Sequence, residues 1–145
     1  MTSAGPPGLQ ELGATLRTAE HAITTETAHL LRGLDLTVRQ YSTMAVLAEK
    51  PDLSGAHLAR LCLITPQSMA AVLAKLGERG LIERSPSEIH ERVLLARLSA
   101  KGWAVLREAE VVTAGAGARL EETLRAVERS QLREYLQRVI EAFAR

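Results

Sequence analysis

Few side chains in this sequence have the types and spacing that catalysis or metal binding requires. Cys62 is the only cysteine, so it can form neither an internal disulfide nor a cysteine-based zinc site. His21 and His29 are eight positions apart on one predicted helix, too far for a compact pair of ligands, and with His57 they would form a metal site only in a dimer. No nucleophile, base and orienting residue follow a catalytic pattern, and no glycine loop follows a strand to hold phosphate. We therefore expect no enzyme, no catalytic residues, no metal and no cofactor.

The composition is that of a folded chain without a strong charge preference. Its 145 residues fit one domain, or one compact unit with an added dimerisation element, and 46% of them are hydrophobic and 24% charged. The net charge of +1 would not by itself suggest a nucleic-acid partner. No apolar stretch is long enough to cross a bilayer, and residues 1–8 have the composition of a short disordered tail rather than a secretory signal. We expect a cytoplasmic protein, and the abundance of Ala, Leu and Arg without any Asn suggests a bacterial source.

Long amphipathic helices are predicted at both ends of the chain. Apolar residues recur at three-, four- and seven-residue steps between residues 9 and 32, which is the period of one helical face, and Gly33 ends this helix. Ser99 caps a second long helix, in whose middle Gly115 and Gly117 favour a bend or a close helix contact. A last helix is expected within residues 128–143. Because these apolar faces are too long for one small domain to bury, we predict an obligate homodimer.

Capping signals divide the middle of the chain into three shorter helices. Thr37 and Gln40 form a capping-box pattern that begins the first of them. Ser54 caps the second, which is short. Thr65, followed by proline at the first helical position, begins the third over residues 66–79. The buried side of this third helix is predicted to consist of Met69, Val72, Leu73 and Leu76.

Two short strands are expected directly after this helix. Residues 81–84 and 93–98 are rich in strand-forming residues, and a polar, turn-prone loop joins them. Two helices with a tight link, followed by such a ribbon, form a winged helix-turn-helix. The fold class is therefore mainly α with a small two-stranded β wing, flanked by N- and C-terminal dimerisation helices. The expected domains are a disordered tail (1–8), an N-terminal dimerisation helix (9–34), the winged helix-turn-helix (35–98) and C-terminal dimerisation helices (99–145).

Three stretches of sequence resemble the MarR family of bacterial regulators, and the resemblance extends over residues 9–143. The stretches are LSGAHLAR (53–60), TPQSM to LGERGLIER (65–84) and HER to LSAKG (90–102). Arg92 matches the family's wing arginine. His90 stands where the family usually has Asp, and Gly77 stands where it usually has Glu near the end of the recognition helix. The first change removes one partner of the salt bridge that commonly orients the wing arginine.

The resemblance implies a regulator of double-stranded DNA whose third short helix enters the major groove by its N-terminal end. Gln67 is the best candidate for reading a base, because its amide can pair with adenine, and Lys75 is placed for a phosphate. Arg92 would enter the minor groove or bind the backbone there. A dimer would present two such helices to a pseudo-palindromic operator with half-sites about one helical turn apart. The predicted DNA-binding residues are Ser54, Thr65, Gln67, Ser68, Ala71, Lys75, His90 and Arg92.

Several of these residues also have a purely structural interpretation. Gln67 and Ser68 are suitable polar residues for a first helical turn. Arg92 would also suit a solvated strand end, and Lys75 would suit any helix surface. A winged-helix protein adaptor that does not bind DNA is therefore a second hypothesis, favoured by the low net charge and by the alanines of the third helix.

The family resemblance further implies repression that ends when a small, often aromatic anion binds between the dimer base and the winged helix. The candidate effector-binding residues are His21, Arg39 and Tyr41, although a surface position for His21 and a core position for Tyr41 are the simpler interpretations. A redox-responsive regulator that senses through Cys62 is another alternative. The apolar neighbours of Cys62 and the absence of an adjacent cation favour a buried, inert thiol.

Overall fold

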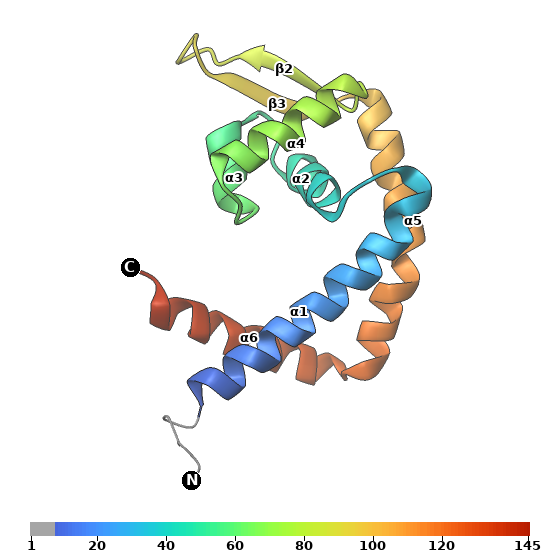
Figure 1. Cartoon of the computed structure of the whole chain (residues 1–145), viewed down its shortest axis with the longest axis vertical. Coiled ribbons are helices and arrows are strands. Elements are labelled where there is room, and N and C mark those ends of the chain that lie inside the picture. The colour runs from blue at the N-terminus through green and yellow to red at the C-terminus, as the bar shows by residue number, and fades with distance from the viewer. Residues whose placement is uncertain (1–7) are drawn as a thin grey trace. The chain divides into compact units, whose positions relative to one another are not determined.

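The computed structural model describes residues 8–145, so residues 1–7 of the predicted tail lie outside the described residues (Figure 1). The chain divides into two compact units, one ending at Val112 and the other comprising residues 113–145. In chain order the elements are α1 (Leu9–Leu31), the 3-10 helix η1 (Arg32–Leu34), α2 (Val38–Glu49), β1 (Leu53–Ser54), α3 (Gly55–Leu61), α4 (Pro66–Glu78), β2 (Ile82–Pro86), β3 (Leu94–Leu98), α5 (Ala100–Thr123) and α6 (Ala126–Phe143).

Helices α2, α3 and α4 begin where local capping predicts. At α2 the Thr37 hydroxyl accepts the N–H of Gln40 at 3.1 Å, and the Gln40 side-chain oxygen accepts the N–H of Thr37 at 3.1 Å, so both halves of the capping box form. Ser54 and Thr65 cap α3 and α4, and α4 has proline at its first position. The chain leaves α4 through Gly80, whose φ of +68° suits a residue without a Cβ.

The sheet has three antiparallel strands in the order β1-β3-β2, one more than the predicted two-stranded wing. β2 and β3 form the expected ribbon. β1 consists of Leu53, which lies opposite Ala96, and Ser54, which lies opposite Leu95. Two residues are too few to show the alternation by which a strand is recognised, so the sequence does not reveal β1. The predicted fold class is confirmed, and the additional strand ties the start of α3 to the wing.

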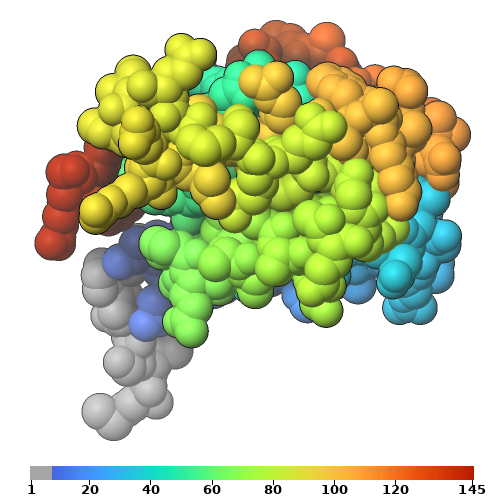
Figure 2. All heavy atoms as spheres, turned by 90° about the horizontal axis from the view of Figure 1, so that it is seen from above, coloured from blue at the N-terminus to red at the C-terminus, as the bar shows by residue number. Residues whose placement is uncertain are grey.

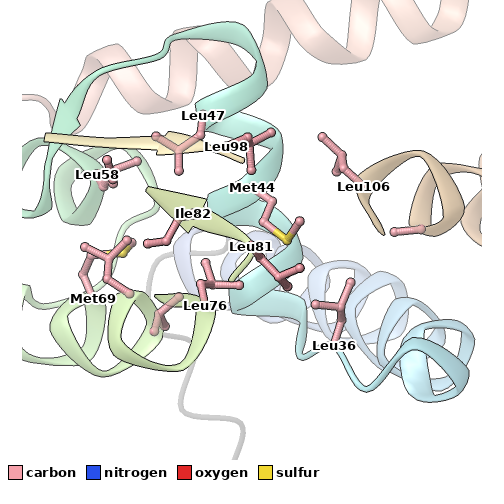
Figure 3. Packing of buried hydrophobic residues seen from close by; sticks show 14 of the residues in the cluster. Leu36, Met44, Leu47, Leu58, Met69, Leu76, Leu81, Ile82, Leu98 and Leu106 are labelled. Atoms are coloured by element: carbon pink, nitrogen blue, oxygen red, sulfur yellow. The ribbon is translucent and has the colours of Figure 1, made fainter. Parts of the chain in front are cut away.

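The hydrophobic core lies in the first unit, between α2, α3, α4, the sheet and the start of α5 (Figure 3). All four residues predicted for the buried side of α4 are buried. Thr43 of α2 is also fully buried, which its polar side chain did not suggest. Its hydroxyl donates to the Arg39 carbonyl at 2.8 Å, and this bond satisfies the hydroxyl away from water. The fully buried side chains of the core include Leu31, Met44, Leu47, Leu58, Met69, Leu76, Leu81 and Leu106.

The start of α5 packs tightly against the turn that follows α4. Ser99 caps the helix as predicted, because its hydroxyl accepts the N–H of Gly102 at 3.0 Å. The same hydroxyl donates to the Gly80 carbonyl at 2.6 Å. A Cβ at Gly102 would overlap the carbonyl oxygen of Leu81, so glycine is required at this position. This junction fixes the place where α5 leaves the winged helix.

The terminal helices expose most of their apolar side chains in the single chain. Of the residues of α1, Leu31 alone is buried, and α6 buries none. α5 is continuous through Gly115 and Gly117, and a Cβ at either would meet no described atom within 4 Å, so the single chain has no close helix contact there. No helix within the described range is long and apolar enough to span a membrane. The exposed large apolar residues include Leu9, Leu12 and Ile23 of α1, Val111 and Leu120 of α5, and Val127, Leu132, Tyr135, Ile140 and Phe143 of α6.

Candidate functional site

Three predicted site residues of α4 share one exposed face of the helix. Gln67, Ala71 and Lys75 follow one another at four-residue steps, and all three are exposed. Figure 2 shows α4, in green, open to solvent on the same side of the molecule as the yellow wing. Lys75 lies 3.7 Å from Glu78, but both side chains are about two-thirds exposed, so this pair restrains the lysine only weakly. The face is accessible, and Gln67 and Lys75 are its only long side chains among these three positions.

Most of the hydrogen-bonding groups in the first turn of α4 are already occupied. The Thr65 hydroxyl accepts the N–H of Ser68 at 3.0 Å and donates to the Ser68 hydroxyl at 2.9 Å. The first helical residue, Pro66, has no N–H. Gln67 therefore presents an exposed amide together with a backbone N–H at the positive end of the helix, where an anion is favoured. Gln67 has the greatest free capacity in this turn to bind a ligand, and Thr65 and Ser68 chiefly organise the helix start.

Ser54 lies at a junction between elements, unlike the exposed residues of α4. Its hydroxyl accepts the N–H of His57 at 3.2 Å as the cap of α3, and its backbone pairs with Leu95 of β3. The residue is half-buried. Of the predicted DNA-binding residues, Ser54 thus has the clearest structural role.

Hydrogen bonds to Ser87 close the loop at the tip of the wing. Its hydroxyl accepts the N–H groups of Ile89 and His90 at 3.2 and 3.3 Å, and its own N–H donates to the Val93 carbonyl at 2.7 Å. The resulting closed loop leaves the Ile89 side chain 84% exposed, a feature that sequence analysis did not single out. His90 and Arg92 are exposed on this loop, and in the described part of the chain neither forms an ion pair. Among residues 8–145, Arg92 therefore has no acidic ion-pair partner, and the preceding wing position is His90 rather than an acidic residue.

Two further arginines of the winged helix were missed by sequence analysis. Arg84 of β2 and Arg60 of α3 are exposed, and within residues 8–145 neither has an ion-pair partner. Alternation from the buried Ile82 would direct Arg84 to the inner face of the ribbon. Its cross-strand partner Ala96 is fully buried, yet Arg84 is exposed, and only the tertiary structure reveals this. The wing also carries acidic residues, so its charge is balanced: Glu83, Glu88 and Glu91.

A hollow of about 530 Å³ lies between α1, the start of α2 and the turn that joins α3 to α4. Its size is within the range of small-molecule sites. Arg39 is on its wall, whereas His21 is exposed on α1 with its Nε2 3.5 Å from the Thr25 hydroxyl, and Tyr41 packs against the core. The three candidate effector residues are therefore not brought together in this hollow. Its lining consists of Glu20, Thr24, Thr37, Val38, Arg39, Ser42, Cys62, Leu63 and Ile64.

Cys62 is a free, half-buried thiol on the wall of the same hollow. Its Sγ lies 3.9 Å from the Thr43 hydroxyl. The residues next to Cys62 in the sequence include no cation, but the structure places Arg39 on the wall of the same hollow. No three His, Cys, Asp or Glu side chains come together as a metal site among the residues that the structure describes.

Comparison with known proteins gives the same family at the level of sequence and of structure. A profile described as "MarR family" matches residues 34–92. The HTH-type transcriptional repressor Rv2887 of Mycobacterium tuberculosis is 34% identical over 131 residues, which cover 90% of this chain and 89% of the repressor.

Two solved structures are informative. The crystal structure of the MarR family protein Rv2887 of Mycobacterium tuberculosis in complex with p-aminosalicylic acid is 33% identical, with a TM-score of 0.70, and the match covers 88% of this chain and 97% of that one. The transcriptional repressor CouR, bound to a 23-mer DNA duplex, is 27% identical, with a TM-score of 0.81, and the match covers 96% of this chain and 99% of CouR.

Proposed function

The chain belongs to the MarR family of transcriptional regulators, and we propose that it represses transcription as a homodimer whose two winged helices bind one pseudo-palindromic DNA site. The observation that carries this proposal is the exposed face of α4, where the amide of Gln67 stands in the first helical turn beside a wing whose exposed Arg92 forms no ion pair within residues 8–145. The similarity to a repressor over 90% of the chain and to a repressor bound to a DNA duplex supports it.

The homodimer follows from the apolar residues that the terminal helices expose. α1 is 23 residues long and buries only Leu31, and α6 exposes Ile140 and Phe143 by 62% and 68%. Apolar faces of this length are seldom left in water, and a second copy of the chain covers them symmetrically. In this proposal residues 9–34 and 99–145 form the dimer and residues 35–98 bind DNA. A dimer also presents each local arginine twice, which offsets the net charge of only +1.

The proposed roles of the site residues follow from their exposure and free hydrogen-bonding groups. Gln67 reads a base edge in the major groove, with Ala71 available for contact with a thymine methyl group. Lys75 binds a phosphate, and Arg92 occupies the minor groove or binds its edge, with His90 beside it. Ser54, Thr65 and Ser68 fix the helix starts. The Ser54 and Ser68 hydroxyls can also donate to phosphates, whereas the Thr65 hydroxyl already donates to Ser68.

We propose the hollow at Arg39 as the effector site. A guanidinium beside the apolar side chains of Val38, Leu63 and Ile64 suits a small aromatic carboxylate, which is also the class of ligand bound in the Rv2887 complex. The hollow adjoins the turn between α3 and α4, so an occupant would act directly on the placement of the recognition helix. His21 and Tyr41 lie on α1 and α2, the helices beside the hollow, but neither lines it.

The proposed setting is the cytoplasm, where a bacterial repressor meets chromosomal DNA, and we propose no catalytic role. The protein adaptor and the Cys62 redox sensor are less well supported than the repressor. CouR, 27% identical, is a repressor bound to DNA. Both Glu20 and Arg39 line the hollow beside Cys62, so the thiol has a carboxylate as well as a cation in its surroundings.

The experiment that tests the proposal is selection of bound fragments from the source genome with the purified dimer, followed by a salt titration on the recovered site. We expect a pseudo-palindromic motif and an affinity that falls steeply as salt rises. A protein that binds neither the recovered fragments nor random duplex at low salt would fit the adaptor and contradict the repressor. Addition of salicylate to the complex then tests effector release, with Arg39→Ala as the variant that should lose the response.

A further inference from the structure

The end of the recognition helix is fastened by one side chain to η1, the single turn that directly follows α1. Arg79, the residue that ends α4, donates from Nη1 to the Asp35 carbonyl at 2.7 Å and from Nη2 to the Leu34 carbonyl at 3.1 Å. Residues 34 and 35 form the end of η1, directly after α1. A planar guanidinium can bind two neighbouring carbonyls at once, whereas an ammonium group acts as a single point charge. Arg79 therefore joins two elements that are more than forty positions apart in the sequence.

Neither carbonyl has a partner within η1 itself, and Arg79 supplies one from elsewhere in the structure. The last carbonyl groups of a helix have no partner within it and carry partial negative charge. η1 is only one turn long, and the chain leaves it through Asp35, whose φ of +52° turns the backbone away from the helix. The Arg79 guanidinium satisfies both carbonyls with charge-assisted hydrogen bonds, which are stronger than those from a neutral donor.

The same turn after α4 is also fastened to the start of α5. The Lys101 ammonium donates to the Arg79 carbonyl at 2.8 Å. The Ser99 hydroxyl and N–H donate to the carbonyls of Gly80 and Leu81 at 2.6 and 3.1 Å. The turn over residues 79–81 is thus bonded both to the end of η1, directly after α1, and to the start of α5.

We propose that Arg79 is a positioning residue for DNA recognition, which sets the orientation of α4 relative to α1 and so fixes the separation of the two recognition helices in the dimer. The inference rests on the proposed function, because it requires α1 to contribute to the dimer. In a symmetric dimer a small rotation of α4 relative to α1 occurs in both copies. The two rotations together change the distance between the two recognition helices. Half-site spacing, rather than the identity of any base, is then the property that Arg79 controls.

The geometry favours a positioning role for Arg79 over a direct DNA contact. Its guanidinium is already bonded to the two carbonyls, and the residue is half-buried, whereas Arg84 and Arg92 are exposed. A hollow of about 310 Å³ adjoins the guanidinium, lined among others by Arg32, Thr37 and Gln40.

The test uses the full-length dimer and a set of operators that share one half-site sequence but differ in the spacing between half-sites by one or two base pairs. We expect Arg79→Ala to reduce the preference for the native spacing over the altered spacings by about fivefold, the size typical of changes in coupling between two sites. Arg79→Lys should fall between wild type and Arg79→Ala, because one ammonium can replace part of the link. Arg84→Ala, a change to an exposed arginine of the wing, should weaken binding by the same factor at every spacing.

The outcomes separate this inference from the proposed function. An unchanged spacing preference in Arg79→Ala, with wild-type DNA binding intact, would overturn the positioning role and leave the repressor proposal standing. A salt slope that falls by about one in Arg79→Ala would identify a phosphate contact and would also overturn it. Failure of the wild-type protein to bind any duplex would overturn both. A melting curve for each variant serves as the control for folding.

Discussion

Asp52 and Arg97 form an ion pair that joins the turn before β1 to the strand β3. Arg97 Nη2 lies 2.6 Å from Asp52 Oδ1, and Nε donates to the same oxygen at 2.7 Å. Asp52 adopts a φ of +61°, a left-handed conformation that aspartate tolerates better than most residues. The ion pair therefore stabilises an unfavourable turn at the place where the chain enters the sheet.

Replacing Asp52 should reveal two separate contributions to stability. Asp52→Ala removes the carboxylate and leaves a left-handed residue with a Cβ, so we expect a loss of about 1 to 2 kcal/mol in the free energy of unfolding. Asp52→Gly loses the ion pair but relieves the backbone, so its cost should stay below about 1 kcal/mol. Urea unfolding of both variants, with Arg97→Ala as the control for the pair alone, measures the difference. Equal losses for the alanine and glycine variants would show that the backbone conformation contributes nothing.

Replacing Leu63, in the turn between α3 and α4, by glycine should stabilise the protein. Its φ is +56°, and its side chain is 90% exposed, so the residue has an unfavourable conformation and little packing to lose. We expect Leu63→Gly to raise the free energy of unfolding by about 0.5 to 1 kcal/mol, because relief of the left-handed strain exceeds the greater chain entropy of glycine. Leu63→Ala removes the side chain but keeps the strain, so it should change stability by less than about 0.5 kcal/mol. Thermal and urea unfolding test both, and a destabilised glycine variant would contradict the account.

Two glycines in helices should respond to alanine in opposite directions. At Gly102 a Cβ would overlap the Leu81 carbonyl oxygen, which is backbone and cannot move aside, so we expect Gly102→Ala to cost more than about 3 kcal/mol. At Gly77 a Cβ would meet no described atom within 4 Å, and Gly77→Ala should stabilise the chain by up to about 1 kcal/mol through helix propensity. Urea unfolding of the matched pair is the measurement. A mild effect at Gly102 would mean that the junction of α5 with the turn after α4 is less tightly packed.

Gln67 and Arg92 should affect DNA binding in different ways. Gln67→Ala should relax the preference at one base pair of each half-site, with a loss of about 1 to 3 kcal/mol on the preferred sequence. Arg92→Ala should weaken binding to all sequences and lower the salt slope. Binding to a library of half-site variants at two salt concentrations distinguishes the two effects. Identical specificity profiles for wild type and Gln67→Ala would refute the base-reading role.

The stability of the first turn of α6 should depend on pH through the ionisation of Glu128. The Arg125 side chain and the Arg125 N–H both hydrogen-bond the Glu128 carboxylate, and they hold the pKa of Glu128 below its usual range. Because the folded-state pKa is lowered, this contribution to stability is present above the unfolded-state pKa and disappears as the pH falls through the lowered value. An NMR titration of the Glu128 carboxyl measures the pKa, and Arg125→Ala should raise it toward its ordinary value. An unchanged Glu128 pKa in Arg125→Ala would contradict the assignment of the lowered pKa to Arg125.

Local interactions are what the sequence by itself determined. The capping pairs at Thr37 and Gln40, the start of α4 at Thr65 and the cap of α5 at Ser99 all act within a few residues of one another. Helical periodicity likewise indicated which side of α4 is buried. Such features depend on one helix turn and its face, so the residue order alone defines them.

The tertiary structure decided the features that join distant segments. β1 is too short to show a pattern and exists only because β3 offers it a partner. The packing of the helices also decides two further placements. It brings Arg39 beside the turn that contains Cys62, and it brings the Arg79 guanidinium onto the Leu34 and Asp35 carbonyls. Only the packing of the helices decides which arginine reaches which backbone carbonyl. No periodicity in the sequence encodes a contact such as that of Arg79 with residues 34 and 35, which lie more than forty positions away.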